Sequence, residues 1–234
     1  MEAVRINKYL SEAGVCSRRG ADKLIKEGRV LINRTLAFLG SVVNEGDEVQ
    51  VDGIIVRTSS KKILIAFNKP RGIVCTTADP KSKDTNIIEY IGYPERIFPM
   101  GRLDKESEGL ILLSNDGDMS NKLMKARNNH EKEYEVEVNR PFDDVFLKGM
   151  SEGVPILDTV TRKCTLKRTG KTTFNIILTQ GLNRQIRRMC EYFGYKVVKL
   201  RRIRIMNIKL GNLKLGAYRN VTDKEYAELI KGLR

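Results

Sequence analysis

The stretch that most constrains the fold lies in the middle of the chain, at residues 99–117. Its apolar run at residues 110–113 is typical of a buried strand. Gly101 and Gly109 permit backbone conformations that other residues resist, so the Gly-Arg-Leu-Asp sequence between them favours a tight connection. The carboxylate of Asp104 is therefore predicted to sit on a rigid turn between extended segments. It is either a reactive group or an ordinary solvated acid.

Strand patterns outnumber helical ones along the chain. Strands are predicted at residues 30–32, 49–51, 54–56, 63–67, 133–138, 163–168 and 174–179. Helices are predicted at residues 4–13, 17–27, 87–90, 119–127, 142–147, 183–193 and 222–230. Because strands and helices do not alternate regularly, the predicted fold class is α+β with a mixed, largely antiparallel sheet.

The distribution of these patterns predicts two domains. Residues 1–58 form a small module in which Ser17 caps the second helix and Asp52-Gly53 makes a hairpin turn. Residues 59–62 are polar and short and are the predicted linker. The larger domain is then residues 63–234.

The charge distribution favours a polyanionic partner. The chain of 234 residues has a net charge of +14, and residues 161–234 carry 19 basic against 4 acidic side chains. A positive field concentrated on one part of a protein attracts nucleic acid. The first module is nearly neutral, but Arg19, Lys23 and Lys26 form a basic stripe along its second helix. On charge alone, that stripe is equally consistent with an ordinary solvated helix face.

Several classes of protein are disfavoured by the composition. The four cysteines are scattered and there is a single histidine, so neither a disulfide framework nor a zinc cluster is expected, and neither a metal nor a cofactor is predicted. No apolar run approaches the length of a membrane span. The first residues also lack the pattern of a signal peptide. We expect a cytoplasmic, monomeric protein that does not bind membranes.

Two further stretches complete a candidate site with Asp104. The first is Lys-Glu-Tyr-Glu-Val at residues 132–136, where Tyr134 is predicted to lie on a strand. A tyrosine on a strand either belongs to a site or, more commonly, packs against its neighbours. In residues 180–194, Gly181 and Asn183 open a helix whose apolar face leaves Arg184, Arg187 and Arg188 to one side. These arginines could also form a solvated surface or contact phosphates.

The three stretches together resemble the motifs of the RsuA-like pseudouridine synthases, in the same order and over roughly residues 61–228. Residues 180–206 are most similar to the RluF-type subgroup, which modifies 23S ribosomal RNA, and transfer RNA is a possible further substrate. The resemblance implies that Asp104 is the nucleophile or base, that Arg187 pairs with it, and that Tyr134 stacks on the base and assists removal of its proton. It also implies that Leu200 lines the base pocket and that Arg102 fills the gap left by the extruded nucleotide. Asn183, Arg184 and Arg188 complete the expected substrate contacts.

Residues 4–57 resemble a small RNA-binding domain first met in a ribosomal small-subunit protein. By that resemblance and by charge, the expected RNA contacts are Arg5, Lys8, Arg18, Arg19, Lys23, Lys26, Lys199, Arg201 and Arg202. A non-catalytic RNA-binding or ribosome-assembly protein would share the charge and this module, but it would have no reason to keep the three-part site. A metal-dependent nuclease would need more metal ligands than Glu106 and Glu108 offer beside Asp104.

Overall fold

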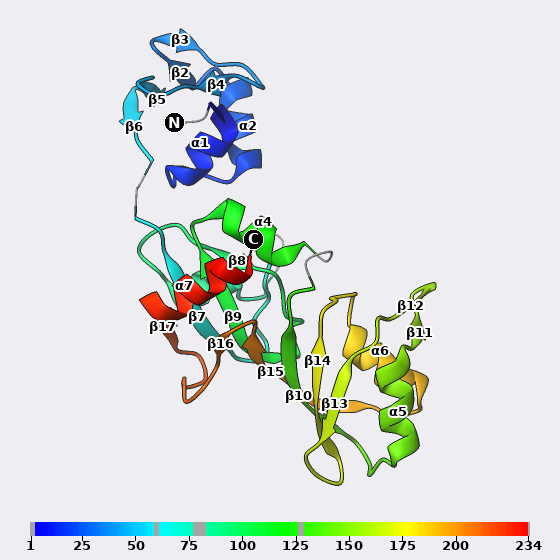
Figure 1. The fold of residues 1–234 in the computed structure, drawn as a ribbon. Helices are drawn as coiled ribbons and strands as arrows, with labels where there is room; N and C mark the ends of the chain where they lie inside the picture. Colours follow the sequence, from blue (N-terminus) through cyan, green and yellow to red (C-terminus); the bar gives the residue numbers. More distant parts are fainter. Residues whose placement is uncertain (1–2, 59–60, 77–82, 126–128, 234) are drawn as a thin grey trace. The chain divides into compact units, whose positions relative to one another are not determined.

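The computed structural model describes residues 3–58, 61–76, 83–125 and 129–233. The chain divides into two compact units (Figure 1). The first comprises Met1–Lys62 with Pro94–Arg96 and Asn115–Gly117, and the second comprises Ile63–Tyr93, Ile97–Ser114 and Asp118–Arg234. Residues 59 and 60 of the predicted linker lie outside the described residues.

The first unit packs two helices against a small sheet. Its helices are α1 (Ile6–Glu12) and α2 (Arg18–Lys26). Its four-stranded sheet has the order β3 (Thr35–Leu36), β2 (Val30–Ile32), β5 (Val49–Val51) and β6 (Ile54–Val56). The predicted strands are confirmed, and the Ser17 hydroxyl accepts a 3.0 Å hydrogen bond from the Gly20 amide, which caps α2 as expected.

The first helix begins later than the sequence predicts. Val4 and Arg5 form strand β1 (Val4–Arg5), which pairs antiparallel with β4 (Val42–Val43). Helical spacing could not reveal this pairing, because the partner strand lies far along the chain. Ile6 and Leu10 of α1 and Ile25 of α2 are buried together with Val30 and Val49 in the core of the unit.

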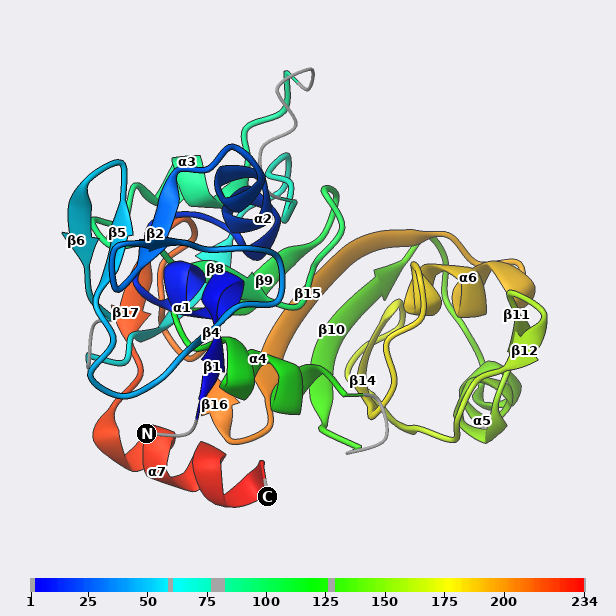
Figure 2. The same cartoon turned by 90° about the horizontal axis from the view of Figure 1, so that it is seen from above.

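The second unit is built on one nine-stranded sheet, which confirms the α+β prediction (Figure 2). Its main path runs β13 (Thr165–Arg168), β14 (Thr173–Leu178), β10 (Lys132–Val138), β15 (Val197–Ile205), β9 (Glu108–Ser114), β7 (Leu64–Lys69) and β17 (Tyr218–Asn220). Off this path, β8 (Phe98–Met100) pairs with β9 and β16 (Ile208–Lys209) pairs with β15. Only the β9–β15 pairing is parallel, so the sheet is mixed and largely antiparallel.

Short elements complete the second unit. They are the helices α3 (Ile87–Ile91), α4 (Gly117–Met124), α5 (Asp144–Glu152), α6 (Gln185–Tyr192) and α7 (Asp223–Gly232), and the strands β11 (Pro155–Ile156) and β12 (Thr159–Val160). A capping box of Thr222 and Glu225 opens α7, the helix predicted at residues 222–230. Residues 126 and 127, at the predicted end of α4, lie outside the described part of the chain. Among the described residues, no helix has the length and apolar character needed to cross a membrane.

Several boundaries differ from prediction, among them those of α5 and β7, and two of the differences have a local cause. Helix α6 begins at Gln185 rather than near Asn183, because Arg184 adopts a left-handed conformation with φ 50°. Strand β13 begins at Thr165 rather than Lys163, because the amide of Cys164 donates to Ser151 at the end of α5 instead of joining the sheet.

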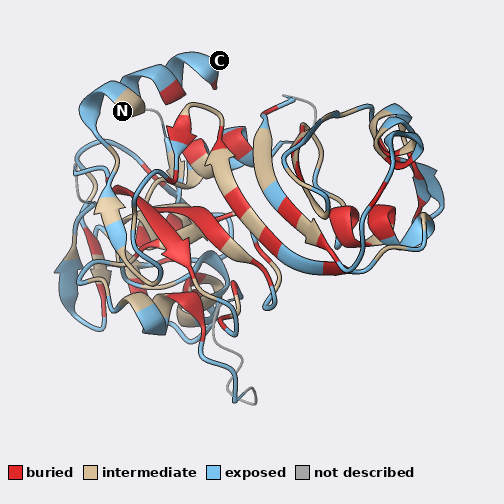
Figure 3. Ribbon diagram, turned by 90° about the horizontal axis from the view of Figure 1, so that it is seen from below, coloured by how far each residue is buried: buried red, intermediate tan, exposed pale blue. Residues whose placement is uncertain are grey.

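The central strands β7 and β9 are apolar on both faces, which explains the uninterrupted run at residues 110–113. Leu110 and Leu112 face a cluster that contains Met119, Leu123 and Leu229 from α4 and α7. Ile111 and Leu113 face a second cluster, which includes Ile87 of α3. Figure 3 shows buried residues along these strands. The turn before β9 is therefore attached to the most deeply buried part of the unit.

The other half of the sheet has a core of its own. Helices α5 and α6 cover β10 and β14, and Phe142, Phe146 and Phe174 make edge or tilted ring contacts with centroids 5.1–5.7 Å apart. Such pairs add stability beyond the burial of their area. The two halves meet where β9 runs beside β15.

Candidate active site

A cavity of about 400 Å³ opens in the second unit, where the three predicted stretches come together. Of the expected site residues, Arg102, Asp104, Tyr134, Asn183, Arg184 and Leu200 line it. Arg187 and Arg188 are not among its lining residues. A volume of this size is ordinary for a small-molecule or nucleotide site.

Asp104 lies on the turn between β8 and β9. The turn begins at Gly101, whose φ of 90° suits glycine, and a Cβ there would meet Met124 at 2.8 Å. The side chain of Asp104 is 34% exposed and is the only carboxylate among the described residues lining the cavity. Glu108 instead contacts Arg71 at 3.7 Å and Lys199 at 3.5 Å.

Arg187 lies buried behind this turn, at 8% exposure, which excludes the alternative that it belongs to a solvated basic surface. Its Nε lies 4.0 Å from an Asp104 carboxylate oxygen. Its amines donate to the Glu106 carbonyl at 3.1 Å, the Ser107 hydroxyl at 3.3 Å and the Val197 carbonyl at 3.3 Å. Burial lowers the pKa of Arg187, and the charge of Arg184 adds to this effect. Arg187 thus both holds the turn and brings positive charge to Asp104.

Lys69 is a second support of the turn, and the sequence analysis missed it. The residue is fully buried, and its ammonium donates to carbonyls of Pro70 at 2.9 Å, Asp104 at 3.3 Å, Lys105 at 3.4 Å and Ser107 at 2.9 Å. Burial lowers its pKa, while nearby acidic groups oppose that shift. The strand predicted at residues 63–67 stops short of this lysine, whereas β7 continues through it.

Tyr134 and Leu200 form apolar parts of the cavity wall. Tyr134 is half-buried and packs against both the α5–α6 core and the β7–β9 core. Leu200 is 6% exposed on the neighbouring strand. An aromatic ring and an aliphatic side chain beside a single acid can accommodate a flat, uncharged base.

Gly109 allows β9, which follows the Asp104 turn, to lie close to β15. It pairs with Arg202 in the parallel register of β9 and β15. Its φ is 107°, and a Cβ would lie 2.3 Å from the Arg202 carbonyl oxygen. Only glycine allows the strands to approach this closely.

The expected basic surface of β15 requires a correction. Arg202 is only 3% exposed, its Nε donates to the Leu110 carbonyl at 2.7 Å, and it lines the cavity. It therefore does not belong to an exposed RNA-binding surface. Lys199 and Arg201 are more accessible, and each lies 3.5 Å from an acidic side chain.

The helix at the far wall of the cavity is preceded by an ordered loop. Gln185 is buried and accepts a 3.0 Å hydrogen bond from the Leu182 amide. Arg188 is half-buried, and its Nε donates to the Asn183 carbonyl at 3.2 Å. Arg184 remains exposed at the cavity.

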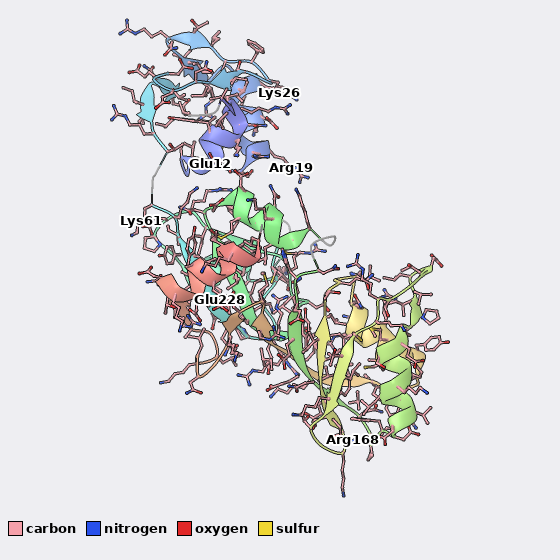
Figure 4. All side chains as sticks on the ribbon, viewed as in Figure 1. Glu12, Arg19, Lys26, Lys61, Arg168 and Glu228 are labelled. Atoms are coloured by element: carbon pink, nitrogen blue, oxygen red, sulfur yellow. The ribbon has the colours of Figure 1, made fainter. Side chains whose placement is uncertain are left out.

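Basic residues of the first unit gather in two places. Arg5, Lys8 and Arg18 line a smaller cavity of about 290 Å³. Arg19 and Lys26 are exposed on α2, where Figure 4 labels both side chains. Lys8 and Lys23 contact Glu12 and Glu27, respectively, at 3.7 Å. Their roles in RNA binding remain predictions.

Comparison with known proteins identifies both parts of the chain. Residues 63–192 match the family described as RNA pseudouridylate synthase, and residues 4–49 match the S4 domain. The chain is 52% identical over 231 residues to proteins named dual-specificity RNA pseudouridine synthase RluF from Salmonella typhi and Escherichia coli strain K12, covering 98% of this chain and 79% of each relative.

More distant relatives agree. An uncharacterized RNA pseudouridine synthase from Aquifex aeolicus is 40% identical over 240 residues, covering 100% of this chain and 96% of the relative. A crystal structure of a pseudouridylate synthase is similar with a TM-score of 0.71 and 28% identity, covering 97% and 99% of the two chains. These matches support the catalytic interpretation over the non-catalytic one. The chain belongs to the RNA pseudouridine synthases, isomerases that convert uridine within RNA to pseudouridine.

Proposed function

We propose that this enzyme modifies a specific uridine in large-subunit, 23S ribosomal RNA, and that a transfer RNA is a second substrate. The similarity of residues 180–206 to RluF-type enzymes supports the ribosomal target. The dual-specificity name of the 52% identical relatives supports the acceptance of more than one RNA.

Asp104 carries the chemistry in this proposal. The isomerisation breaks the N1–C1′ bond, joins C1′ to C5 of the same uracil, and moves a proton from C5 to N1. No electrons are gained or lost, and one carboxylate can serve as nucleophile or base. The observation that supports this role most directly is that Asp104 is the only carboxylate lining the cavity within the described residues, on a turn held by Arg187 and Lys69.

The other cavity residues bind the flipped nucleotide. A base inside an RNA helix cannot reach Asp104, so the nucleotide must leave its stack. Tyr134 stacks on the uracil and assists removal of its proton, and Leu200 contacts the base edge. Arg102 and Arg184 are exposed at the cavity and contact the surrounding RNA, together with Asn183 and Arg188.

Mapping of pseudouridines in total RNA tests which RNAs are the substrates. RNA from cells with and without the gene is compared at nucleotide resolution, and the deletion is complemented with wild type or with Asp104→Asn. We expect one 23S position and one transfer RNA position to lose pseudouridine and to regain it only with wild type. Unchanged 23S RNA would contradict the ribosomal assignment, and unchanged transfer RNA would contradict the second substrate.

We further propose that residues 1–58 bind RNA independently of the chemistry. Removing them should leave a folded fragment, because the sheet of the second unit is formed by residues after 63. The fragment should bind RNA more weakly, and the slope of log affinity against log salt should fall by about 0.7 for each lost phosphate contact. Filter binding over a salt series measures both quantities. An insoluble fragment, or one with undiminished affinity, would contradict the proposal.

A cytoplasmic location and a monomeric state complete the proposal. All four cysteines are free, as is common in a reducing compartment. Cell fractionation and light scattering measure location and mass, and a membrane-bound or dimeric protein would contradict these assignments.

A further inference from the structure

Two cations in the cavity have no part in the roles assigned above. Lys132 begins β10 and Arg202 lies on β15, and both line the same cavity as Asp104 and Tyr134. The Arg202 guanidinium carbon lies 5.9 Å from the centre of the Tyr134 ring. Positive charge is therefore placed next to the aromatic side chain on which the base is proposed to stack.

Neither cation has its charge balanced by the protein. Arg202 is 3% exposed, and its Nη2 has no hydrogen-bond partner although its Nε is fixed on the Leu110 carbonyl. The Lys132 ammonium has one contact, a 3.3 Å hydrogen bond to the His130 carbonyl. Within the described ranges, neither side chain forms an ion pair with a carboxylate.

This arrangement destabilises the empty site. Burial, with the charge of Arg202 acting in the same direction, lowers the pKa of Lys132 to about 8. The other ionisable groups lining the cavity are Arg102, Asp104, Lys125, His130, Tyr134 and Arg184. A buried charge without a partner is costly, so a site that keeps two neighbouring cations suits a ligand that brings negative charge.

We propose that Lys132 and Arg202 bind the carbonyl oxygens of the uracil and stabilise the negative charge that the base acquires when its N1–C1′ bond breaks. This inference rests on the proposed function of the cavity. Pre-placed charges that meet charge developing in the transition state are among the strongest contributions to catalysis.

The isomerisation neither gains nor loses electrons. When the N1–C1′ bond breaks, its electron pair stays on the uracil, which becomes an anion with charge spread over its ring and carbonyl oxygens. The ribose C1′ is left electron-poor, in the cavity that also holds the Asp104 carboxylate. An electron pair of the base then forms the C5–C1′ bond, C5 loses its proton, and N1 gains one. The two cations exchange no proton in this scheme.

A backbone phosphate is the competing ligand, and the depth of the site argues against it. Arg102 and Arg184 already present exposed cations at the cavity. Arg202 is only 3% exposed but lines the cavity, so a ligand must enter the cavity to reach its guanidinium. A flat base that enters the cavity is better suited to reach this position than a phosphate on the surface of an RNA.

Single-turnover rates of the full-length enzyme test the proposal on the RNA that the mapping identifies. Lys132→Gln should slow pseudouridine formation about 10²-fold, the effect of losing one stabilising donor, while the Kd for RNA stays within about twofold. Lys132→Arg keeps the charge and should recover most of the rate. Lys148→Gln removes a charge from exposed α5 and serves as the control. An unchanged rate for Lys132→Gln beside an active wild type, or a weaker Kd at an unchanged rate, would overturn the proposal. An inactive wild type would instead contradict the proposed substrate.

An RNA whose target base is more acidic than uracil shows whether Lys132 stabilises the anion or only supports the structure. Fluorine at C5 withdraws electrons and stabilises the uracil anion. Bond cleavage should therefore depend less on the positive charge of Lys132. The rate of N1–C1′ cleavage with 5-fluorouridine RNA, followed by digestion and chromatography, should therefore fall less in Lys132→Gln than the rate with uridine RNA does. An equal loss with both RNAs would contradict a role in stabilising the anion.

Lys132→Gln should raise the melting temperature of the protein although it lowers the rate of the reaction. Unfolded Lys132 has an ordinary pKa of about 10.4, above its folded value. Charged Lys132 therefore costs stability below about pH 8, and this cost fades as the pH rises toward about 10. Lys132→Gln should melt about 2–4 °C higher than wild type at pH 7, with the difference vanishing near pH 10. A lower melting temperature would show that Lys132 is a structural residue.

Discussion

Asp104→Asn is expected to produce a folded protein that binds RNA and forms no detectable pseudouridine. The substitution keeps the size and shape of the side chain but removes its charge and its nucleophilic oxygen. No other carboxylate among the described residues lines the cavity, and Glu108 is directed toward Arg71 and Lys199. The loss should exceed about 10⁴-fold, as for other residues on which a reaction depends.

Tritium release from RNA labelled at the uridine C5 position measures this activity, and a thermal melt run beside it reports folding. Asp84→Asn makes the same change at an acid that is 40% exposed and paired with Lys105, and it should leave the rate unchanged. If Asp104 were only structural, activity would fall in step with the folded fraction. A folded Asp104→Asn protein with normal release would remove Asp104 from the mechanism.

Arg187→Met is expected to cost about 10²- to 10³-fold in rate, the range for a removed catalytic donor. The change removes the charge 4.0 Å from Asp104 and the hydrogen bonds to Glu106, Ser107 and Val197. Buried carbonyls left without donors cost about 1–3 kcal/mol, so the melting temperature should also fall by several degrees. RNA affinity should change little, because Arg187 is buried away from the RNA surface.

The matched control is Arg188→Met, on the same helix. Arg188 is half-buried, and its guanidinium donates hydrogen bonds to Asn183, so this variant should weaken RNA binding more than it slows chemistry. Normal turnover of Arg187→Met would place this arginine outside the site.

Local patterns predicted much of the fold. Strands 30–32, 49–51 and 54–56 were predictable because alternation and the Asp52-Gly53 turn are properties of neighbouring residues. The turn at Asp104 and the buried strand after it were predictable for the same reason.

Burial of charged side chains could not be predicted in this way. Lys69 is buried because carbonyls from residues 104, 105 and 107 surround its ammonium, and no local pattern shows that distant segment. Arg187 is buried by contact with the same turn. Arg202 points into the cavity because β15 runs parallel to β9, a pairing between segments about a hundred residues apart. Its Leu-Arg-Arg sequence looks like an exposed basic surface.

The two halves of the sheet are joined by a short parallel contact between β9 and β15, which we call the seam. Only two residue pairs, Arg201 with Glu108 and Arg202 with Gly109, join the strands there. Each side of the seam has a hydrophobic core of its own, and Tyr134 packs against both. Arg187 of α6 contacts the turn that carries Asp104. A substitution that alters the seam is therefore expected to move Asp104 relative to Tyr134.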